Sequence, residues 1–276
     1  MSSLASSSSS QPQAHWITPA EQLRRLHNPM VEELSRVTPL ISDLANMVAE
    51  YVGGGKSLTN WHTSLVCLNA LPSKIPPLPT DIGEILESKC PIYSNDEEEK
   101  SDDAPLKVKD THFLALIPEE FVSLNHLGGK ILEPYGKKKY VAGYNPLKFS
   151  YFDAKGQQTY GDVKFSPTHW VLMTRNLLPR SQSKSGVPLV QLVSDLSKKA
   201  FVNYEVPTLQ ETFAAITTHM VASGERLYGT KPNNFTYVQE KTDGFPLAIG
   251  GFCSVGVMID SNYKSGNVGL AALRKF

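Results

Sequence analysis

The stretch "NYEVPTLQETFAAI", Asn203–Ile216, changes character at its proline. Its first four residues predict the end of a short strand. Thr208 and Glu211 then have the spacing of a helix capping box, in which the hydroxyl and the carboxylate each satisfy an orphan backbone N–H. We therefore expect a helix over Leu209–Ala222, ended by Gly224. A strand, a proline and a capped helix can open a catalytic site or can serve only as framework.

The composition is that of a soluble globular protein, with 276 residues, 41% hydrophobic and 20% charged. The 27 basic and 27 acidic residues cancel, so the net charge gives no reason to expect nucleic acid or an anionic membrane as a partner. The cysteines Cys67, Cys90 and Cys253 are far apart and odd in number, which argues against a disulfide framework. They also lack zinc-ligand spacing, and we expect no metal and no cofactor.

The N-terminus, "MSSLASSSSSQPQ", has neither the basic nor the apolar region of a secretory signal. We expect residues 1–17 to be a disordered tail, and the protein to be cytoplasmic or exported without a cleavable signal peptide. The longest uncharged run, Gly244–Ile259, is shorter than a membrane span and contains four glycines. It predicts buried strands, and no membrane span is expected.

Two domains are predicted on either side of an acidic run. Residues 18–94 contain the helical stripe of 38–52 and a second apolar stretch, Leu58–Leu71, and predict a small helical module. Residues 95–104, which include "NDEEEKSDD", predict a linker. Residues 105–276 predict an α+β domain, which we expect to remain folded when residues 1–104 are deleted.

The C-terminal domain alternates strand-like and helical patterns. Buried strands are predicted at "HFLALIP" and "HWVLMTRNL", and a helix from Pro188 onward. "KKKYVAGY" and "KFSYFDAKGQQTYGDV" predict strands joined by glycine turns. Three short strands are expected to close the chain: "FTYVQ", "FPLAIGGFCSVGVMI" broken at its glycines, and "VGLAALRKF".

Three patterns suggest chemistry and are better explained structurally. "GGGKS" lacks the first glycine of a phosphate loop, because that position holds Glu50, so it is assigned to a helix end. "YGKKKYVAGYNPLKFSYF" mixes lysines with aromatics as single-strand nucleic-acid sites do, but strands with one solvated face give the same pattern. The seven histidines lack local metal-ligand spacing, and His169 and His219 are expected in the core.

The C-terminal half carries a family resemblance. "YEVPTLQETFAAI" resembles the "LPTEAEWEYA" segment of the formylglycine-generating-enzyme (sulfatase-modifying-factor) branch of the C-type lectin fold. "GGF" at Gly250–Phe252 is similar to the "RGGSW" of that branch, and "GLAALR" at Gly269–Arg274 to its closing "GFR". The resemblance covers residues 105–276 and implies a C-type-lectin-like α+β domain, in which two helices flank one mainly antiparallel sheet. The closing strand, Val268–Lys275, is expected to be buried in that sheet near the first strand of the domain. In such a domain the strand, proline and capped helix are framework.

The resemblance does not extend to the oxidation chemistry of that family. Those enzymes hold copper with a cysteine pair near the C-terminus, whereas Cys253 is the only cysteine after residue 90 here. A non-enzymatic binding protein is therefore expected, and a formylglycine-generating-enzyme-like oxidoreductase is the disfavoured alternative. Bacterial variable proteins diversified by retroelements are similar. They bind ligands through residues between the Gly-Gly motif and the closing strand.

In this chain the corresponding window is "CSVGVMIDSNYKSGNV", Cys253–Val268. Alternation would bury Val255, Val257 and Ile259. The loop after Asp260 has the polar and aromatic mixture of antibody loops, and an unknown protein, peptide or glycan is the expected ligand. An ordinary polar hairpin turn explains the same composition, and both interpretations remain open. The expected ligand-binding residues are Ser254, Met258, Asp260, Asn262, Tyr263, Lys264 and Asn267, with Tyr237 from the preceding strand.

The N-terminal stretch "PLISDLANMVAEYV" faintly resembles an F-box-type helix. That resemblance would imply an adaptor that recruits a ubiquitin ligase. It covers one helix, and other amphipathic helices have a similar pattern.

Overall fold

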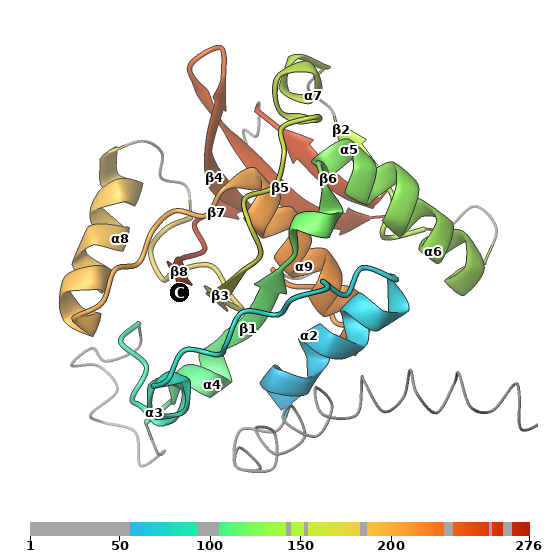
Figure 1. The fold of residues 1–276 in the computed structure, drawn as a ribbon. Helices are drawn as coiled ribbons and strands as arrows, with labels where there is room; N and C mark the ends of the chain where they lie inside the picture. Colours follow the sequence, from blue (N-terminus) through green and yellow to red (C-terminus); the bar gives the residue numbers. More distant parts are fainter. Residues whose placement is uncertain are drawn as a thin grey trace, which may run out of the picture. The chain divides into compact units, whose positions relative to one another are not determined.

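The computed structural model describes residues 56–92, 105–141, 145–151, 154–182, 187–228, 234–253, 256–261 and 267–276 (Figure 1). They fall in one compact unit and have the mixed α+β architecture expected from the sequence. The predicted tail 1–17, the F-box-like helix and the linker 95–104 lie outside the described residues. None of the described helices combines the length and the apolar composition that a membrane span requires.

Helices precede, separate and cover the strands. They are α2 (Lys56–Cys67), α3 (Ile82–Glu87), α4 (Val108–Thr111), α5 (Leu124–His126), α6 (Glu133–Lys139), α7 (Ala154–Tyr160), α8 (Val187–Ala200) and α9 (Leu209–Ser223), with a short 3-10 helix at Glu119–Phe121 and a π-helix at Leu127–Leu132. The strands are β1 (His112–Ile117), β2 (Phe149–Tyr151), β3 (His169–Thr174), β4 (Phe235–Thr242), β5 (Phe245–Cys253), β6 (Gly256–Asp260), β7 (Val268–Gly269) and β8 (Leu273–Lys275).

The strands form two sheets rather than the single one expected. The smaller sheet has the order β1-β3-β8 and is antiparallel. The larger has the order β2-β6-β5-β4-β7, in which β2 runs parallel to β6 and β7 parallel to β4. The predicted strands at β1 and β3 are confirmed, and nearly all of their residues are buried.

The closing segment of the chain belongs to both sheets. Its burial is as predicted, but it contributes β7 to the larger sheet and β8 to the smaller. The residues between them, Leu270–Ala272, cross from one sheet to the other. Their backbone N–H groups donate in turn to Ser181 Oγ at 3.0 Å, Thr236 Oγ1 at 2.7 Å and Thr174 Oγ1 at 3.2 Å. These hydroxyls replace the strand partner that the crossing segment lacks.

The predicted capped helix is confirmed as α9 and lies at the centre of the fold (Figure 1). Thr208 is its N-cap and Gly224 its left-handed C-cap, with φ of 73°. Every residue from Leu209 to Met220 except Gln210 is buried, because α9 contacts α2 and β1 as well as β4 and β5. A helix that is enclosed in this way needs apolar or small residues around its whole circumference.

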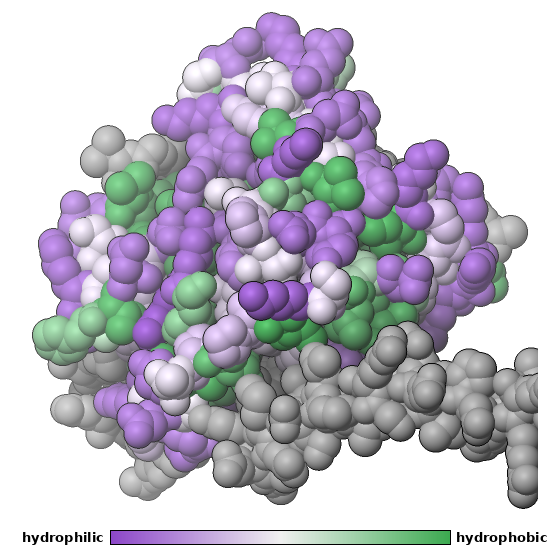
Figure 2. Space-filling model, viewed as in Figure 1, coloured by the Kyte–Doolittle hydropathy of each residue, from purple (hydrophilic) through white to green (hydrophobic). Residues whose placement is uncertain are grey.

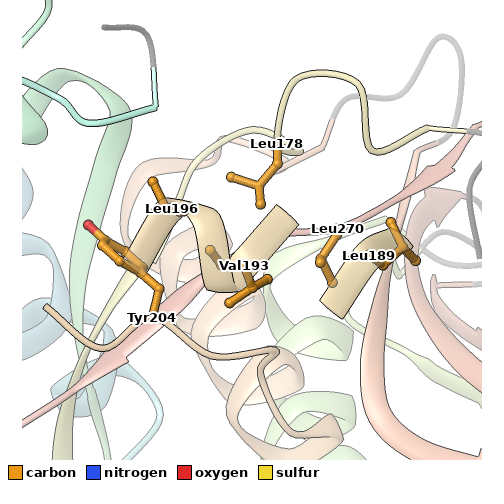
Figure 3. Packing of buried hydrophobic residues seen from close by; sticks show 7 residues of the cluster. Leu178, Leu189, Val193, Leu196, Tyr204 and Leu270 are labelled. Atoms are coloured by element: carbon orange, nitrogen blue, oxygen red, sulfur yellow. The ribbon is translucent and has the colours of Figure 1, made fainter. Parts of the chain in front are cut away.

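A second apolar cluster attaches α8 to the crossing segment. Leu189, Val193 and Leu196 lie on one side of α8 and pack with Leu270 and Leu178 (Figure 3). The predicted helix from Pro188 is thereby confirmed, and its apolar spacing explains which side faces the core.

The lysine-rich stretch differs from its predicted strand. Residues 133–139 form α6, which begins with Glu133-Pro134 and ends with three lysines. Cations in the last turn favour a helix. Pro134 does not lie at a free helix start, because Leu132 before α6 is itself helical and α6 continues the π-helix. Lys137 also pairs with Glu133 at 2.8 Å, one helical turn away. The stretch that follows contains the strand β2 and the helix α7 instead of strands alone.

The described part of the predicted N-terminal module, residues 56–92, packs on the C-terminal elements. Leu65 is 0% exposed in α2, and Trp61 meets Trp170 of β3 edge-on at a ring distance of 4.8 Å. Ser64 Oγ donates to the carbonyl of Thr218 in α9 at 2.7 Å. This arrangement differs from a separate module with a boundary at residues 95–104, because the apolar side of α2 is buried against β1 and α9.

We expect α2 to be required for folding. Deletion of residues 1–70 or 1–104 exposes the surface that α2 covers, and should abolish cooperative thermal unfolding, whereas deletion of residues 1–50 should preserve it.

In the full chain, Leu65→Ala should lower the free energy of unfolding by about 2–5 kcal/mol. Val66, its neighbour, is 53% exposed, and Val66→Ala should change it by less than about 0.5 kcal/mol. Cooperative unfolding of the 105–276 fragment would restore the sequence-predicted boundary.

Candidate functional site

One face of the larger sheet brings together three of the sequence-predicted site residues. Across β4, β5 and β6, Tyr237 pairs with Ala248 and Ala248 with Asp260, while Gly250 pairs with Met258. Directly paired residues project on the same side of a sheet. This surface is called the Tyr237 face and comprises Phe235, Tyr237, Ala248, Gly250, Met258, Asp260 and Val268.

The opposite face of the same sheet is sealed. Thr236, Ile249, Val257 and Ile259 project there and are fully buried, and α9 contacts β4 and β5. The predicted alternation in β6 is therefore confirmed for Val257 and Ile259, and Met258 and Asp260 are both partly exposed. α9 therefore covers the side of this sheet opposite the Tyr237 face.

The Tyr237 face combines an apolar centre with polar groups. Phe235, Ala248 and Val268 form a buried cluster, against which the Tyr237 ring and Met258 pack. Burial raises the pKa of Tyr237, so its hydroxyl stays protonated over the physiological range. A partly buried aromatic ring with a hydroxyl at its edge is a common recognition group.

Two glycines allow the strands to approach closely beside this face. Gly250 has φ of 154°, and a Cβ there would lie 2.4 Å from the carbonyl oxygen of Asn234. Gly251 has φ of 57°, and a Cβ there would lie 2.4 Å from the Phe235 ring and 2.8 Å from Met258 Cε. The Gly-Gly motif is thus framework: it fixes where Phe235 and Met258 lie.

Polar groups lie at the end of the face where β4 begins. The carbonyl of Asn267 accepts from the N–H of Phe235 at 3.1 Å, so Asn267 lies beside the first residue of β4. Asn234 Oδ1 is buried and has no hydrogen-bond partner among the described residues. Such an acceptor is costly unless water or a ligand satisfies it. The other predicted site residues lie outside the described residues: Ser254, Asn262, Tyr263 and Lys264.

A cluster around Glu211 was not predicted as a site. Its Oε2 accepts from the backbone N–H of Thr208 at 2.9 Å, completing the capping box, and from the Thr208 hydroxyl at 2.8 Å. Its Oε1 accepts from Lys275 Nζ at 3.0 Å and meets His169 Nε2 at 3.2 Å. The sequence spacing of Thr208 and Glu211 predicts the contacts of the capping box. His169 and Lys275 are distant from Glu211 in the sequence, and no sequence pattern predicts their contacts with it.

The hydrogen bonds within this cluster stabilise the charged forms of Glu211 and His169. Burial raises the pKa of Glu211, but hydrogen bonds from His169, Thr208 and Lys275 outweigh it and lower that pKa to about 2. Burial lowers the pKa of His169, and its bonds to Glu211 and to the carbonyl of Pro167 outweigh it, so the net pKa is raised. Burial raises the pKa of the neighbouring Glu240, whose carboxylate accepts from the N–H of Leu209.

The Glu211 cluster has the residue types of an acid–base site but is better explained as a structural lock. Both carboxylate oxygens are occupied by the helix cap, His169 and Lys275, so no acceptor position remains for a substrate proton. Among the described residues, no three His, Cys, Asp or Glu side chains form a group suited to a metal ion.

A second unpredicted network is buried between β1 and the segment before α9. The Thr111 hydroxyl lies 3.1 Å from Cys90 Sγ and 2.8 Å from His112 Nδ1, and the Tyr204 hydroxyl lies 3.2 Å from His112 Nε2. Burial lowers the pKa of His112 to about 4 and raises that of Tyr204 to about 12. Both side chains are therefore neutral at pH 7 and suit a satisfied core network.

Comparison of the chain with protein-family models, with curated proteins and with solved structures gave no match. The Tyr237 face is the candidate site, because it brings sequence-predicted residues together on the side of the larger sheet opposite α9.

The pKa shift of His169 predicts a pH-dependent contribution to stability. Because its folded-state pKa lies above the ordinary 6.5, the contribution is fully present below that pH and is lost as pH rises through the folded-state pKa. The free energy of unfolding of the wild type minus that of His169→Gln should be constant below about pH 6 and should fall toward alkaline pH. Urea titrations between pH 5 and 9 measure it. A difference that grows with pH would contradict the assignment.

The glycine geometry predicts unequal effects of one substitution. Gly250→Ala forces a Cβ onto a backbone oxygen at a backbone angle that side chains rarely adopt, and should lower the free energy of unfolding by about 2 kcal/mol or more. Gly129→Ala is the matched control. A Cβ there meets nothing within 4 Å and the residue is helical, so stability should be unchanged or higher. Equal urea midpoints for the two variants would show that Gly250 is not framework.

Proposed function

We propose that this chain is a non-enzymatic binding protein that recognises a protein, peptide or glycan ligand with the Tyr237 face and the segment that follows β6. One observation carries the proposal: Tyr237, Met258 and Asp260 share the one face of the larger sheet that α9 leaves uncovered. A rigid sheet is a good base for such a surface, because little conformational entropy is lost when a ligand binds.

We propose that the segment between β6 and β7 extends this surface. Its sequence contains Asn262, Tyr263 and Lys264. It follows Asp260, the last residue of β6, and leads through Asn267 into β7 of the same sheet. Tyr263 is the proposed anchor, because a tyrosine offers a large contact area with few rotatable bonds.

We also propose that residues 105–276 adopt a variant of the C-type lectin fold of the formylglycine-generating-enzyme branch. Two features support this: the framework role of the Gly-Gly motif, and the burial of the closing segment beside the first sheet. The oxidase alternative has no support in the chain, since Cys253 has no second cysteine near it in sequence. Stoichiometric copper together with a reactive Cys253 in the purified protein would overturn this view.

A binding screen with matched variants tests the proposed function. The probes are a phage-displayed random peptide library and a glycan array, applied to the full chain. Ligands enriched on the wild type should bind the Met258→Ala, Asp260→Ala, Tyr263→Ala triple variant at least about tenfold more weakly. The control is Lys74→Ala, Lys130→Ala, Lys164→Ala, three exposed positions outside the larger sheet, which should bind as the wild type does.

Thermal unfolding of each variant separates recognition from structure. A folded triple variant that binds every enriched ligand normally would place recognition elsewhere. Loss of folding in the triple variant would make these side chains structural and would equally contradict the proposal.

A further inference from the structure

Two neighbouring cavities form a groove along α8, and none of the residues of the Tyr237 face lines them. Their volumes are about 470 and 430 Å³, and Pro91 and Lys199 line both. One wall is α8, from Leu192 to Lys199. That stretch spans about 10 Å of helix axis, the length of about three residues of extended chain. The groove therefore has room for a short extended peptide.

The floor of the groove is apolar and belongs to the packed core. Leu178 and Leu196 lie there, and Figure 3 shows both beside Val193. Tyr204 and Val202 continue this floor toward α3. An apolar side chain laid into the groove would contact a surface that is already fixed by packing.

Basic residues outnumber acidic ones around the groove. The basic residues are Lys89, Arg180, Lys198, Lys199 and Arg274. The acidic residues are Asp81, Glu84 and Asp195, and Asp195 already lies 3.7 Å from Lys198 and accepts from Gln191. Among the described residues, no carboxylate forms an ion pair with Lys89, Arg180 or Arg274. The groove is thus cationic in a chain whose net charge is zero.

Two exposed residues, one lining this groove and one adjacent in sequence to residues that line it, occupy backbone conformations that suit glycine better. Arg180 has φ of 61° and lines the second cavity. Phe201 has φ of 54°, follows the last residue of α8 and is 94% exposed. Its neighbours in sequence, Ala200 and Val202, line the first cavity. A left-handed residue after a helix is usually glycine, and an exposed phenylalanine there gains nothing from packing within the described chain.

We propose that this groove is a docking site for an acidic, extended peptide segment of another protein, whose apolar residue packs on Phe201 and whose carboxylates face Lys89, Arg180 and Arg274. Arginine and lysine around an apolar floor complement alternating acidic and apolar residues. The residues that line the groove differ from those of the Tyr237 face, although Tyr237 packs against the cluster that forms the groove floor. Variants of Arg180 and Phe201 therefore test the groove, and variants of Met258, Asp260 and Tyr263 test the other surface.

The test uses two arrays of synthetic hexapeptides and the full-length protein. In one array Leu or Phe alternates with Asp or Glu; in the other, Lys or Arg replaces each acidic residue. The acidic array should bind, and fluorescence anisotropy of its strongest members should show affinity falling as salt rises from 50 to 500 mM. The basic array should not bind. Binding by neither array, or equal binding by both, would overturn the proposal.

Glycine variants distinguish a loss of peptide binding from a loss of folding. Arg180→Gly and Phe201→Gly suit the local backbone, so neither should lower the thermal midpoint, yet each should weaken peptide binding by about tenfold or more. Val190→Ala is the control, because Val190 is 62% exposed on α8 and neither it nor its neighbours Leu189 and Gln191 line either cavity. The triple variant of the Tyr237 face should also bind the peptides normally.

Two further results would refute the docking site. One is unchanged peptide affinity in both glycine variants. The other is concentration-dependent self-association, measured by sedimentation, that the glycine variants abolish while no peptide binds. The second result would assign the groove to another copy of this chain.

Discussion

The Glu211 carboxylate holds the first turn of α9 against one end of the smaller sheet, where β3 begins and β8 ends. It caps its own helix through Thr208, contacts His169 where β3 begins and receives Lys275 at the end of β8. Without it, three charged or polar groups would be left around a nearly buried helix end, which is more costly than the loss of one surface ion pair. Because α9 contacts elements of both sheets, its starting point fixes how α2, β1 and the larger sheet approach each other.

The same need to satisfy buried backbone groups explains why two sheets can share one closing segment. Leu270–Ala272 pass between the sheets where no regular strand partner is present, and three side-chain hydroxyls accept their N–H groups. Threonine and serine are the residues that can do this in a tight space, since a hydroxyl accepts without carrying charge. Thr174 and Thr236 come from one sheet each, so the hydroxyls also join β3 to β4.

Local patterns predicted local structure well here. The capping box and Gly224 predicted α9, the apolar runs predicted β1 and β3, and alternation predicted which residues of β6 are buried. The pattern failed at residues 133–139, where lysines between aromatics suit a strand or a helix. The division into two sheets, the burial of α2 and the groove along α8 depend on pairings between distant residues, which one sequence does not reveal. Of the candidate site, Tyr237, Met258 and Asp260 were named from the sequence, while their common face became visible only through the strand register.

The two proposed surfaces differ in the physical reason for their exposure. On the Tyr237 face, the residues are those that alternation directs away from α9, so their outward position is a by-product of burying Val257 and Ile259. At the groove, Arg180 and Phe201 are held in left-handed conformations where glycine would fit at lower cost, and alternation does not account for them. Phe201 is 94% exposed, so packing of its side chain among the described residues does not explain its left-handed backbone. The groove therefore rests on an energetic cost in the fold itself, whereas the Tyr237 face rests on residue type and position.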